Sequence, residues 1–273
     1  MKKRPSFPAS LDATLAKNRP NALGGMPLAS IASASSRTKP VPQQSAHQAY
    51  QGMGMDSRAV RARMVQKLTA QGVSDPQVLA AMGTIERHQF VDSALANQAY
   101  EDTSLPIGLG QTISKPGVVA RMLELLLDAK PDKSEKLGRV LEIGTGCGYQ
   151  AAVLSLLASE VYSIERLRGL HDKARENLRP LCLDNLHLLF GDGMQGYAKA
   201  APYAAIIAAA GGEALPAAWL DQLAVGGRLV APVVTTSAQS SAQALMVVDK
   251  TPQGIRQTVL EAVHFVPLKS GVA

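Results

Sequence analysis

The stretch Gly138-Arg-Val-Leu-Glu-Ile-Gly-Thr-Gly-Cys-Gly-Tyr149 joins an apolar run, an acidic residue and three glycines at alternate positions. The apolar residues of Val140–Ile143 are typical of a strand that is buried on both faces. The glycines that follow, Gly144, Gly146 and Gly148, permit a tight turn and let a ligand approach the backbone closely. The stretch therefore predicts a buried strand that ends in a ligand-binding turn.

The spacing of the glycines distinguishes between two classes of nucleotide-type cofactor. The dinucleotide fingerprint G-x-G-x-x-G requires a third glycine at the position of Tyr149, so a dehydrogenase is disfavoured. An acid ahead of the glycines, Glu142, and a second acid at the end of the next apolar run, Glu165, resemble the pattern of S-adenosylmethionine-dependent methyltransferases. The alternative is a glycine-rich turn of an α/β protein that binds no cofactor.

A third acidic residue, Asp192, lies between two glycines directly after the apolar run at residues 186–190. Ligands of open α/β sheets bind beyond the carboxyl ends of the strands, so Glu142, Glu165 and Asp192 are expected to meet at one crevice. Glu165 suits the ribose hydroxyls, by analogy with dinucleotide sites. Asp192 is a candidate acceptor for the adenine amino group, and Glu142 is a candidate to order the turn or attract the methionine ammonium. Each acid taken alone is compatible with a solvated loop residue.

Four ordered motifs resemble one family. They are L-P-I-G-x-G-Q-T-I-S-x-P at residues 105–116, V-L-E-I-G-T-G-x-G-Y at residues 140–149, G-D-G at residues 191–193 and V-x-F-V-P-L at residues 263–268. In this order they resemble the protein-L-isoaspartate O-methyltransferases, and the resemblance extends over about residues 58–272. It implies a Rossmann-like class I methyltransferase fold and S-adenosyl-L-methionine as the cofactor.

The resemblance also implies an activity, the repair of damaged proteins. An L-isoaspartyl residue, formed when asparagine deamidates or aspartate isomerises, is methylated on its free α-carboxyl group. The ester then closes to a succinimide without further catalysis, and hydrolysis of that ring returns some normal aspartate. Isoaspartyl-containing proteins and peptides are therefore the expected substrates.

Methyl transfer to a carboxylate does not need a strong base. A carboxyl group with a pKa near ~4 is already ionised at neutral pH. Positioning is expected to supply most of the rate, since effective molarities of roughly 10⁵ M or more are reached in well-oriented reactions. A sequence without a Ser-His-Asp or metal-ligand pattern is compatible with this chemistry.

Ser114 is the candidate catalytic residue. The resemblance places the serine of Q-T-I-S at the active site, where its hydroxyl would donate to the substrate carboxylate and fix its line of attack. The alternative is that Ser114 caps a helix that begins near Pro116, because serine ahead of proline and an apolar periodic run marks a helix N-terminus. The two roles are compatible, since a helix N-terminus also favours a bound carboxylate.

The same motifs supply the remaining expected site residues. Those for the cofactor are Thr112, Glu142, Gly144, Gly146, Glu165, Asp192 and Gly193, and those for the substrate are Ile107, Gln111, Phe265, Val266 and Pro267. Three positions depart from the family pattern: Cys147 replaces a usual serine, His264 a common arginine, and Ala204 a usual acid before the fourth strand.

The alternation of apolar runs and helical segments predicts a doubly wound, mostly parallel sheet with right-handed crossovers. Parallel strands are expected at residues 139–143, 160–164, 186–190, 204–209 and 227–234. Residues 244–249 and 256–265 are expected to add an antiparallel edge pair. Helices are expected at residues 116–127 and 150–158, and residues 56–90 predict two short helices with a break at 72–76.

The first 55 residues differ from the rest of the chain. They are rich in Ser, Ala, Pro, Gln and basic residues and contain one acid, Asp12. This composition predicts a disordered extension over residues 1–55 ahead of a methyltransferase domain over residues 56–273. An import signal is the alternative, which the prolines and the missing apolar core of a signal peptide disfavour. The basic extension contributes to the net charge of +6, but without interleaved aromatic residues no specific nucleic-acid partner is expected.

Cysteine usage and hydropathy indicate the compartment. Cys147 and Cys182 are too few for a disulfide scaffold, and the cysteines and histidines lack metal-ligand spacing. No apolar run approaches the roughly 18 residues of a membrane span. We therefore expect a cytoplasmic enzyme without a metal or a membrane partner. It is expected to be a monomer, as the family is and as the absence of a coiled-coil pattern permits.

Two other functions stay open. A different S-adenosylmethionine-dependent methyltransferase, acting on a small molecule or RNA, would need a Leu105–Pro116 segment that does not admit a peptide. The basic extension would then matter for RNA. A cofactor-binding or interaction module without activity would tolerate replacement of Ser114.

Overall fold

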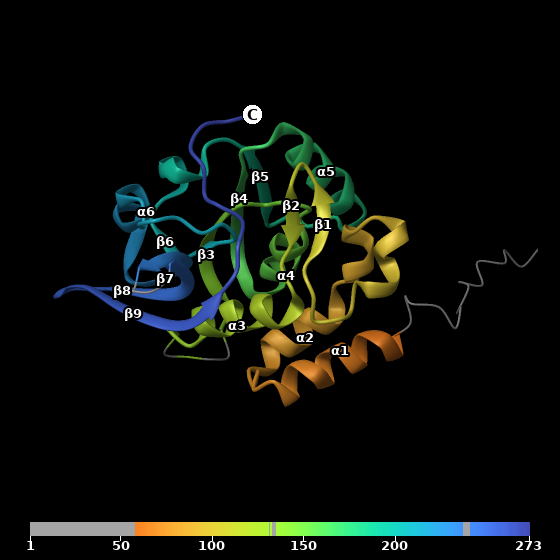
Figure 1. Cartoon of the computed structure of the whole chain (residues 1–273). Helices are drawn as coiled ribbons and strands as arrows, with labels where there is room; N and C mark the ends of the chain where they lie inside the picture. Colours follow the sequence, from red (N-terminus) through yellow and green to blue (C-terminus); the bar gives the residue numbers. More distant parts are fainter. Residues whose placement is uncertain (1–57, 131, 133–134, 237–240) are drawn as a thin grey trace, which may run out of the picture. The chain divides into compact units, whose positions relative to one another are not determined.

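A seven-stranded sheet organises the chain in the computed structural model, which describes residues 58–130, 132, 135–236 and 241–273 (Figure 1). Its strand order is β5-β4-β3-β6-β7-β8-β9. The strands are β3 (Leu137–Ile143), β4 (Ala158–Glu165), β5 (Leu186–Phe190), β6 (Tyr203–Ala208), β7 (Leu223–Thr236), β8 (Ser241–Thr251) and β9 (Gly254–Val263). Strands β5, β4, β3, β6 and β7 are parallel, whereas β8 and β9 are antiparallel at one edge. The predicted fold class, including the antiparallel edge pair, is confirmed.

Helices cover both faces of this sheet. The helices are α1 (Arg58–Ala70), α2 (Pro76–Thr84), α3 (Pro116–Leu127), α4 (Tyr149–Leu157), α5 (Arg168–Leu178) and α6 (Ala217–Gln222). Alternate residues of β3 enter two separate hydrophobic clusters: Val140 packs with residues of α3, α4 and α5, and Leu141 packs with Trp219 of α6. Helices α1 and α2 lie outside α3 and α4 in the same cluster as Val140. The period-2 alternation of the strand thus divides the core between the two faces.

The middle of the sheet contains the point where the strand order reverses. Strand β3 pairs in parallel with β4 on one side and with β6 on the other. The connection after β3 runs through α4 on one face of the sheet and the connection after β6 runs through α6 on the other, which opens a crevice between the β3 and β6 ends. The residues after Ile143 and Ala208 consequently lie at this crevice, and Ala209 donates its N–H to the Ile143 carbonyl at 2.8 Å.

A short hairpin precedes α3 and was not predicted from the sequence. Strands β1 (Leu105–Gly108) and β2 (Gln111–Ile113) pair antiparallel, with Leu105 opposite Ile113. Its tip takes positive φ at three successive residues: 98° at Gly108, 52° at Leu109 and 69° at Gly110. The two glycines adopt this conformation readily and Leu109 does so at a cost in backbone strain.

A buried carboxylate attaches the segment between α1 and α2 to α3. Glu124 accepts hydrogen bonds from the N–H of Ser74 (2.7 Å), the hydroxyl of Ser74 (3.0 Å) and the N–H of Asp75 (2.9 Å). Burial opposes ionisation of Glu124, yet these bonds and Arg121 at 3.3 Å hold the pKa of its carboxyl below the ordinary value. The sequence break at residues 72–76, of which only Val73 is buried, is thereby attached to α3.

The predicted extension at residues 1–55 lies outside the described residues. The described residues all belong to one compact unit, and their first helix begins at Arg58. Within that part, no helix combines the length and the apolar character needed to cross a membrane.

Candidate functional site

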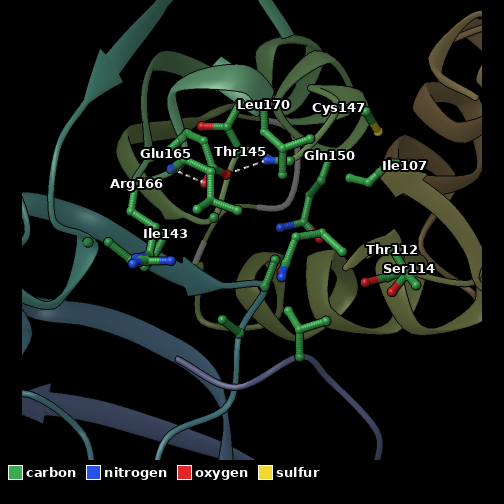
Figure 2. A pocket seen from close by; sticks show the side chains of 18 of the residues that line it. Ile107, Thr112, Ser114, Ile143, Thr145, Cys147, Gln150, Glu165, Arg166 and Leu170 are labelled. Atoms are coloured by element: carbon green, nitrogen blue, oxygen red, sulfur yellow. Dashed lines mark hydrogen bonds between the residues drawn. The ribbon is translucent and has the colours of Figure 1, made fainter. Parts of the chain in front are cut away.

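A cavity of about 290 Å³ lies at the carboxyl ends of β3, β4 and β6. The turn after β3, the hairpin β1–β2, the start of α5 and a segment near the end of the chain line it. In the view of Figure 2, Glu165 and Arg166 lie on one side of this cavity and Thr112 and Ser114 lie on the other, with Gln150 between them. Segments that are far apart in the sequence therefore form a single site, which we call the cofactor cavity.

The glycine turn forms the floor of the cofactor cavity. Gly144, Gly146 and Gly148 have φ angles of 90°, 58° and 93°, which other residues rarely adopt. The N–H groups of Gly144 and Thr145 donate to the Ile164 carbonyl at 2.9 and 3.2 Å, so β4 holds the start of the turn. A side chain at position 148 would approach Cδ1 of Leu178 to 2.8 Å. The glycines are thus required both by the backbone path and by the close approach of α5.

Glu165 ends β4 and lines the cofactor cavity. Its side chain accepts hydrogen bonds from the N–H groups of Gly146 and Leu167, each at 2.9 Å, and the residue is 5% exposed. A carboxylate has about four lone-pair positions, so two further donors can be accommodated. This geometry leaves Glu165 able to bind a diol inside the cavity while it holds the turn.

Glu142 lies beneath the turn and is not among the residues that line the cavity. It is fully buried and accepts a hydrogen bond from the Ser163 hydroxyl. Burial raises the pKa of its carboxyl to about 8, the negative charge of Glu165 adds to this shift, and the side chains of Ser163 and Gln150 oppose it. Glu142 is therefore mostly protonated at neutral pH.

Asp192 is placed beside the cavity rather than in its lining. Its Oδ1 accepts from the N–H of Met194 at 2.9 Å, and its Oδ2 accepts from the N–H of Gly271 at 2.7 Å. The next residue, Gly193, does line the cavity, and a side chain there would approach Cγ2 of Ile143 to 2.6 Å. Asp192 thus fixes the backbone that brings Gly193 against β3.

The hairpin brings the residues of the first motif to the cavity. Ile107, Gln111, Thr112 and Ser114 all line it, and Nζ of Lys173 on α5 donates to the Ile107 carbonyl at 3.0 Å. This contact attaches the hairpin to the helix that follows β4.

Ser114 lies where two cavities meet. Besides the cofactor cavity it lines a second cavity of about 870 Å³, which we call the outer groove. Lys115 and Arg121 of the α3 segment and Glu261 and His264 of the β9 segment also line the outer groove. A ligand in the groove and a ligand in the cofactor cavity would therefore both reach Ser114.

The helix-capping interpretation of Ser114 is wrong. The N-cap of α3 is Lys115, and no side chain of its own segment caps it. Instead, Oδ1 of Asp102 accepts from the N–H of Gly117 at 2.7 Å. A residue distant in sequence supplies the cap, which leaves the Ser114 hydroxyl available to a ligand.

The end of the chain closes one side of the cofactor cavity. Val266 and Pro267 line it, whereas Phe265 does not and instead bonds through its backbone N–H to the Gln243 side chain at 2.7 Å. The segment continues across the β4 end, where the N–H of Ala273 donates to the Arg166 carbonyl at 2.8 Å. Hydrogen bonds of its backbone to the side chains of Gln243 and Asp192 and to the Arg166 carbonyl set its path.

Several residues that line the cofactor cavity were not predicted from the sequence. Arg166, Leu167 and Leu170 follow the β4 end directly, so their position after Glu165 was a usable signal. Lys269 carried no local signal, because its place depends on the path of the final segment. Of the family departures, Cys147 lines the cofactor cavity with its thiol pKa raised by burial, His264 lines the outer groove, and Ala204 lies on β6 beside Gly138.

The raised pKa of Glu142 predicts how stability depends on pH. Between the ordinary pKa of 4.5 and about 8 the folded protein holds a proton that the unfolded chain releases, so the free energy of unfolding should fall as pH rises. The wild-type protein should lose a few kcal/mol of unfolding free energy across this range, at about 1.4 kcal/mol per pKa unit. Glu142→Gln cannot ionise, so its unfolding free energy should not show this loss. Urea unfolding at several pH values measures both proteins. Parallel curves would contradict the buried, protonated state.

Comparison with known proteins agrees with this site. The family model for protein-L-isoaspartate(D-aspartate) O-methyltransferase matches residues 59–273. A protein-L-isoaspartate O-methyltransferase from Methylibium petroleiphilum is 62% identical over 81% of this chain and 81% of its own length. The relative of that name from Leptothrix cholodnii is 63% identical over 81% of this chain and 77% of its own length.

A solved structure extends the similarity to three dimensions. A Plasmodium falciparum protein assigned to the same family, in complex with S-adenosyl-L-homocysteine, superposes with a TM-score of 0.65 at 25% identity over 77% of this chain and 98% of that one. The match of the family model to nearly all of the described residues, together with the identity to curated relatives, leads to one conclusion. The chain belongs to the protein-L-isoaspartate(D-aspartate) O-methyltransferase family.

Proposed function

We propose that the protein transfers a methyl group from S-adenosyl-L-methionine to the free α-carboxylate of L-isoaspartyl residues in damaged proteins. Family membership makes it a methyltransferase. The position of Ser114 between two cavities is the observation from which we assign one cavity to the cofactor and the other to the substrate. One cavity lies on the glycine turn and suits a nucleoside, and the other has a volume of about 870 Å³ and is lined by charged side chains, which suits a peptide.

The residues of the cofactor cavity fit S-adenosyl-L-methionine. Glu165 retains lone pairs for the ribose hydroxyls, and the turn at Gly144 and Gly146 lets the ligand approach the backbone. Gln150 lines the same cavity, and its buried side chain also interacts with the Glu142 carboxyl beneath the turn. We assign the amino-acid end of the cofactor to the turn and Gln150, with Thr112 as a further contact from the hairpin.

The adenine end is assigned to the β5 end of the cavity. Gly193 supplies the surface there because a side chain would collide with Ile143. Asp192 holds that backbone, and its contact with the adenine amino group stays a prediction. Glu142 supports the turn from below in its protonated form.

The chemistry depends on orientation rather than on a base. When bound, S-adenosyl-L-methionine supplies an electrophilic methyl group on a sulfonium centre. The substrate carboxylate is already ionised near neutral pH, so no residue has to remove a proton from it. We propose that the Ser114 hydroxyl donates to one oxygen of that carboxylate and directs the other oxygen along the line of transfer. Ile107, Gln111, Val266 and Pro267 would enclose the reacting group, with Phe265 beside them.

The outer groove is proposed to hold the substrate peptide. It carries charges of both signs, which are mutually paired: Arg121 contacts Glu261 at 3.1 Å, and Lys115 lies 4.0 Å from Asp102. Paired charges suit a binding surface that accepts varied sequences, since no single net charge is selected. Such tolerance is what a repair enzyme requires.

We further propose that the protein acts as a monomer in the cytoplasm, without a nucleic-acid partner. Both cysteines are free, Cys147 in the interior and Cys182 at the surface, as expected in a reducing compartment.

Isoaspartyl peptide should be the methyl acceptor. With radiolabelled S-adenosyl-L-methionine, we expect the label in a peptide that contains L-isoaspartate and not in the matched aspartyl peptide, which lacks the free α-carboxylate at that residue. The product should be a base-labile ester. Labelled RNA or a labelled small molecule, with both peptides unlabelled, would instead favour the alternative methyltransferase.

Replacing Ser114 should impair transfer without affecting the cofactor. We expect Ser114→Ala to lower kcat/KM for the isoaspartyl peptide by roughly 10- to 100-fold, because the carboxylate loses its orienting donor. Affinity for S-adenosyl-L-homocysteine, measured by calorimetry, should not change. Ser93→Ala, at an exposed serine outside both cavities, is the matched control. Full activity of Ser114→Ala would remove this residue from the mechanism.

Replacing Glu165 should have the opposite profile. Glu165→Gln loses the charge that accepts from the turn and the ribose, so the Kd for S-adenosyl-L-homocysteine should rise by roughly tenfold or more. Calorimetry measures it, and Glu176→Gln, on the exposed side of α5, controls for loss of a surface charge. An unchanged Kd would exclude the ribose assignment.

A further inference from the structure

Arg87 lines neither cavity, but it contacts residues that do. Arg87 begins the short 3₁₀ helix η1 (Arg87–Phe90), lies outside the four motifs, and is 0% exposed. Burial of its guanidinium lowers the pKa of the group below the ordinary value. Its place in the interior therefore has a cost that apolar packing would not have.

The guanidinium binds the backbone of two separate segments. Nε donates to the Ala99 carbonyl and Nη2 donates to the Ser114 carbonyl, each at 2.7 Å. Both distances are at the short end for a charged donor, which indicates strong, well-directed hydrogen bonds. The second bond acts on the residue that the proposed function places between cofactor and substrate.

The face of the same guanidinium packs on the cofactor side. Its central carbon lies 4.8 Å from the centroid of the Tyr149 ring, and Tyr149 begins α4 directly after the glycine turn. Tyr149 lines the cofactor cavity and is held edge-on by Phe90 at 5.6 Å between ring centroids. Arg87 thus contacts both the end of the turn and the backbone of Ser114.

A purely structural role does not account well for this arginine. Nη1 is buried and makes no well-formed hydrogen bond to a described residue, and the guanidinium interacts instead with the Tyr149 side chain. Even buried ion pairs can often be replaced by well-packed apolar residues without loss of stability. A planar group with donors at fixed angles is instead suited to holding two backbones at a defined separation.

We propose that Arg87 is a positioning residue for methyl transfer: its guanidinium fixes the Ser114 backbone relative to Tyr149 and the glycine turn, and so sets the direction of the Ser114 hydroxyl. This inference rests on the proposed function of Ser114. Arg87 itself does not line either cavity and acts through Ser114.

The test is a double-mutant cycle on the full-length protein. Arg87→Lys keeps a positive charge but loses the planar fork, so kcat/KM for the isoaspartyl peptide should fall by roughly 10- to 100-fold, as misplacement of a reacting group does. The Kd for S-adenosyl-L-homocysteine should stay within about threefold, a smaller change than loss of a charged contact would cause. In the Ser114→Ala background, Arg87→Lys should lower kcat/KM by less than about twofold, because residues that act as a unit are not additive.

Arg228→Lys is the matched control. Arg228 also donates to a buried backbone carbonyl, that of Leu125 at 2.9 Å, and pairs with Asp249 at 2.6 Å, away from both cavities. It should lower the melting temperature without lowering kcat/KM. If Arg87→Lys does not fold, Arg87→Gln replaces it, because its side-chain amide can still donate to one carbonyl. This variant is kept in saturating S-adenosyl-L-methionine, which stabilises the folded state, until it is diluted into the peptide substrate.

The outcomes separate the two proposals. Multiplicative losses in the cycle, or full activity of Arg87→Lys, would overturn the positioning role while wild-type methylation of the isoaspartyl peptide still supports the proposed function. Wild-type protein that binds S-adenosyl-L-homocysteine but methylates no isoaspartyl peptide would instead refute the proposed function, and the inference with it.

Discussion

Strand β4 holds the glycine turn in its left-handed path, and the other parts of the site are arranged around that turn. The Ile164 carbonyl accepts from the N–H groups of Gly144 and Thr145, and the Glu165 carboxylate accepts from Gly146. The turn also sets the start of α4 and, through the bare α-carbon of Gly148, the distance at which Leu178 of α5 packs. A side chain at any of these glycines would have to adopt positive φ, so the geometry depends on their absence of Cβ.

Segments remote from the turn then enclose the cavity by bonding to α5 and to residues just after β4 and β5. Lys173 on α5 binds the hairpin at Ile107, and the final segment of the chain bonds to the backbone at Arg166 and to the Asp192 carboxylate. Glu165 and Asp192, the acids at the β4 and β5 ends, therefore already bind backbone N–H groups of the protein in the absence of a ligand. Their remaining lone pairs are held at fixed positions, which is the preorganisation that a binding site requires.

Two buried ionisable groups lie next to the site, and burial opposes the charge of each. Glu142 is kept mostly protonated under the turn, and Arg87 is held behind Ser114 with the pKa of its guanidinium lowered. Such costs are commonly concentrated at functional sites, where geometry matters more than stability. In this protein both lie next to one turn: Glu142 is the second-to-last residue of β3 before it, and Arg87 packs on Tyr149, the first residue after it.

The sequence by itself determined the sheet, its order of strands and helices, and the ends of the strands at which the ligand site would form. These follow from local patterns, because periodicity and glycine spacing act over a few residues, and the helix predicted at residues 116–127 matches α3. Tertiary structure alone decided which acids face the cavity, that Asp102 rather than Ser114 caps α3, and that Arg87 and the final segment reach the site. Each of these depends on contacts between residues far apart in the chain, and a local pattern carries no information about which distant donor will satisfy a given backbone group.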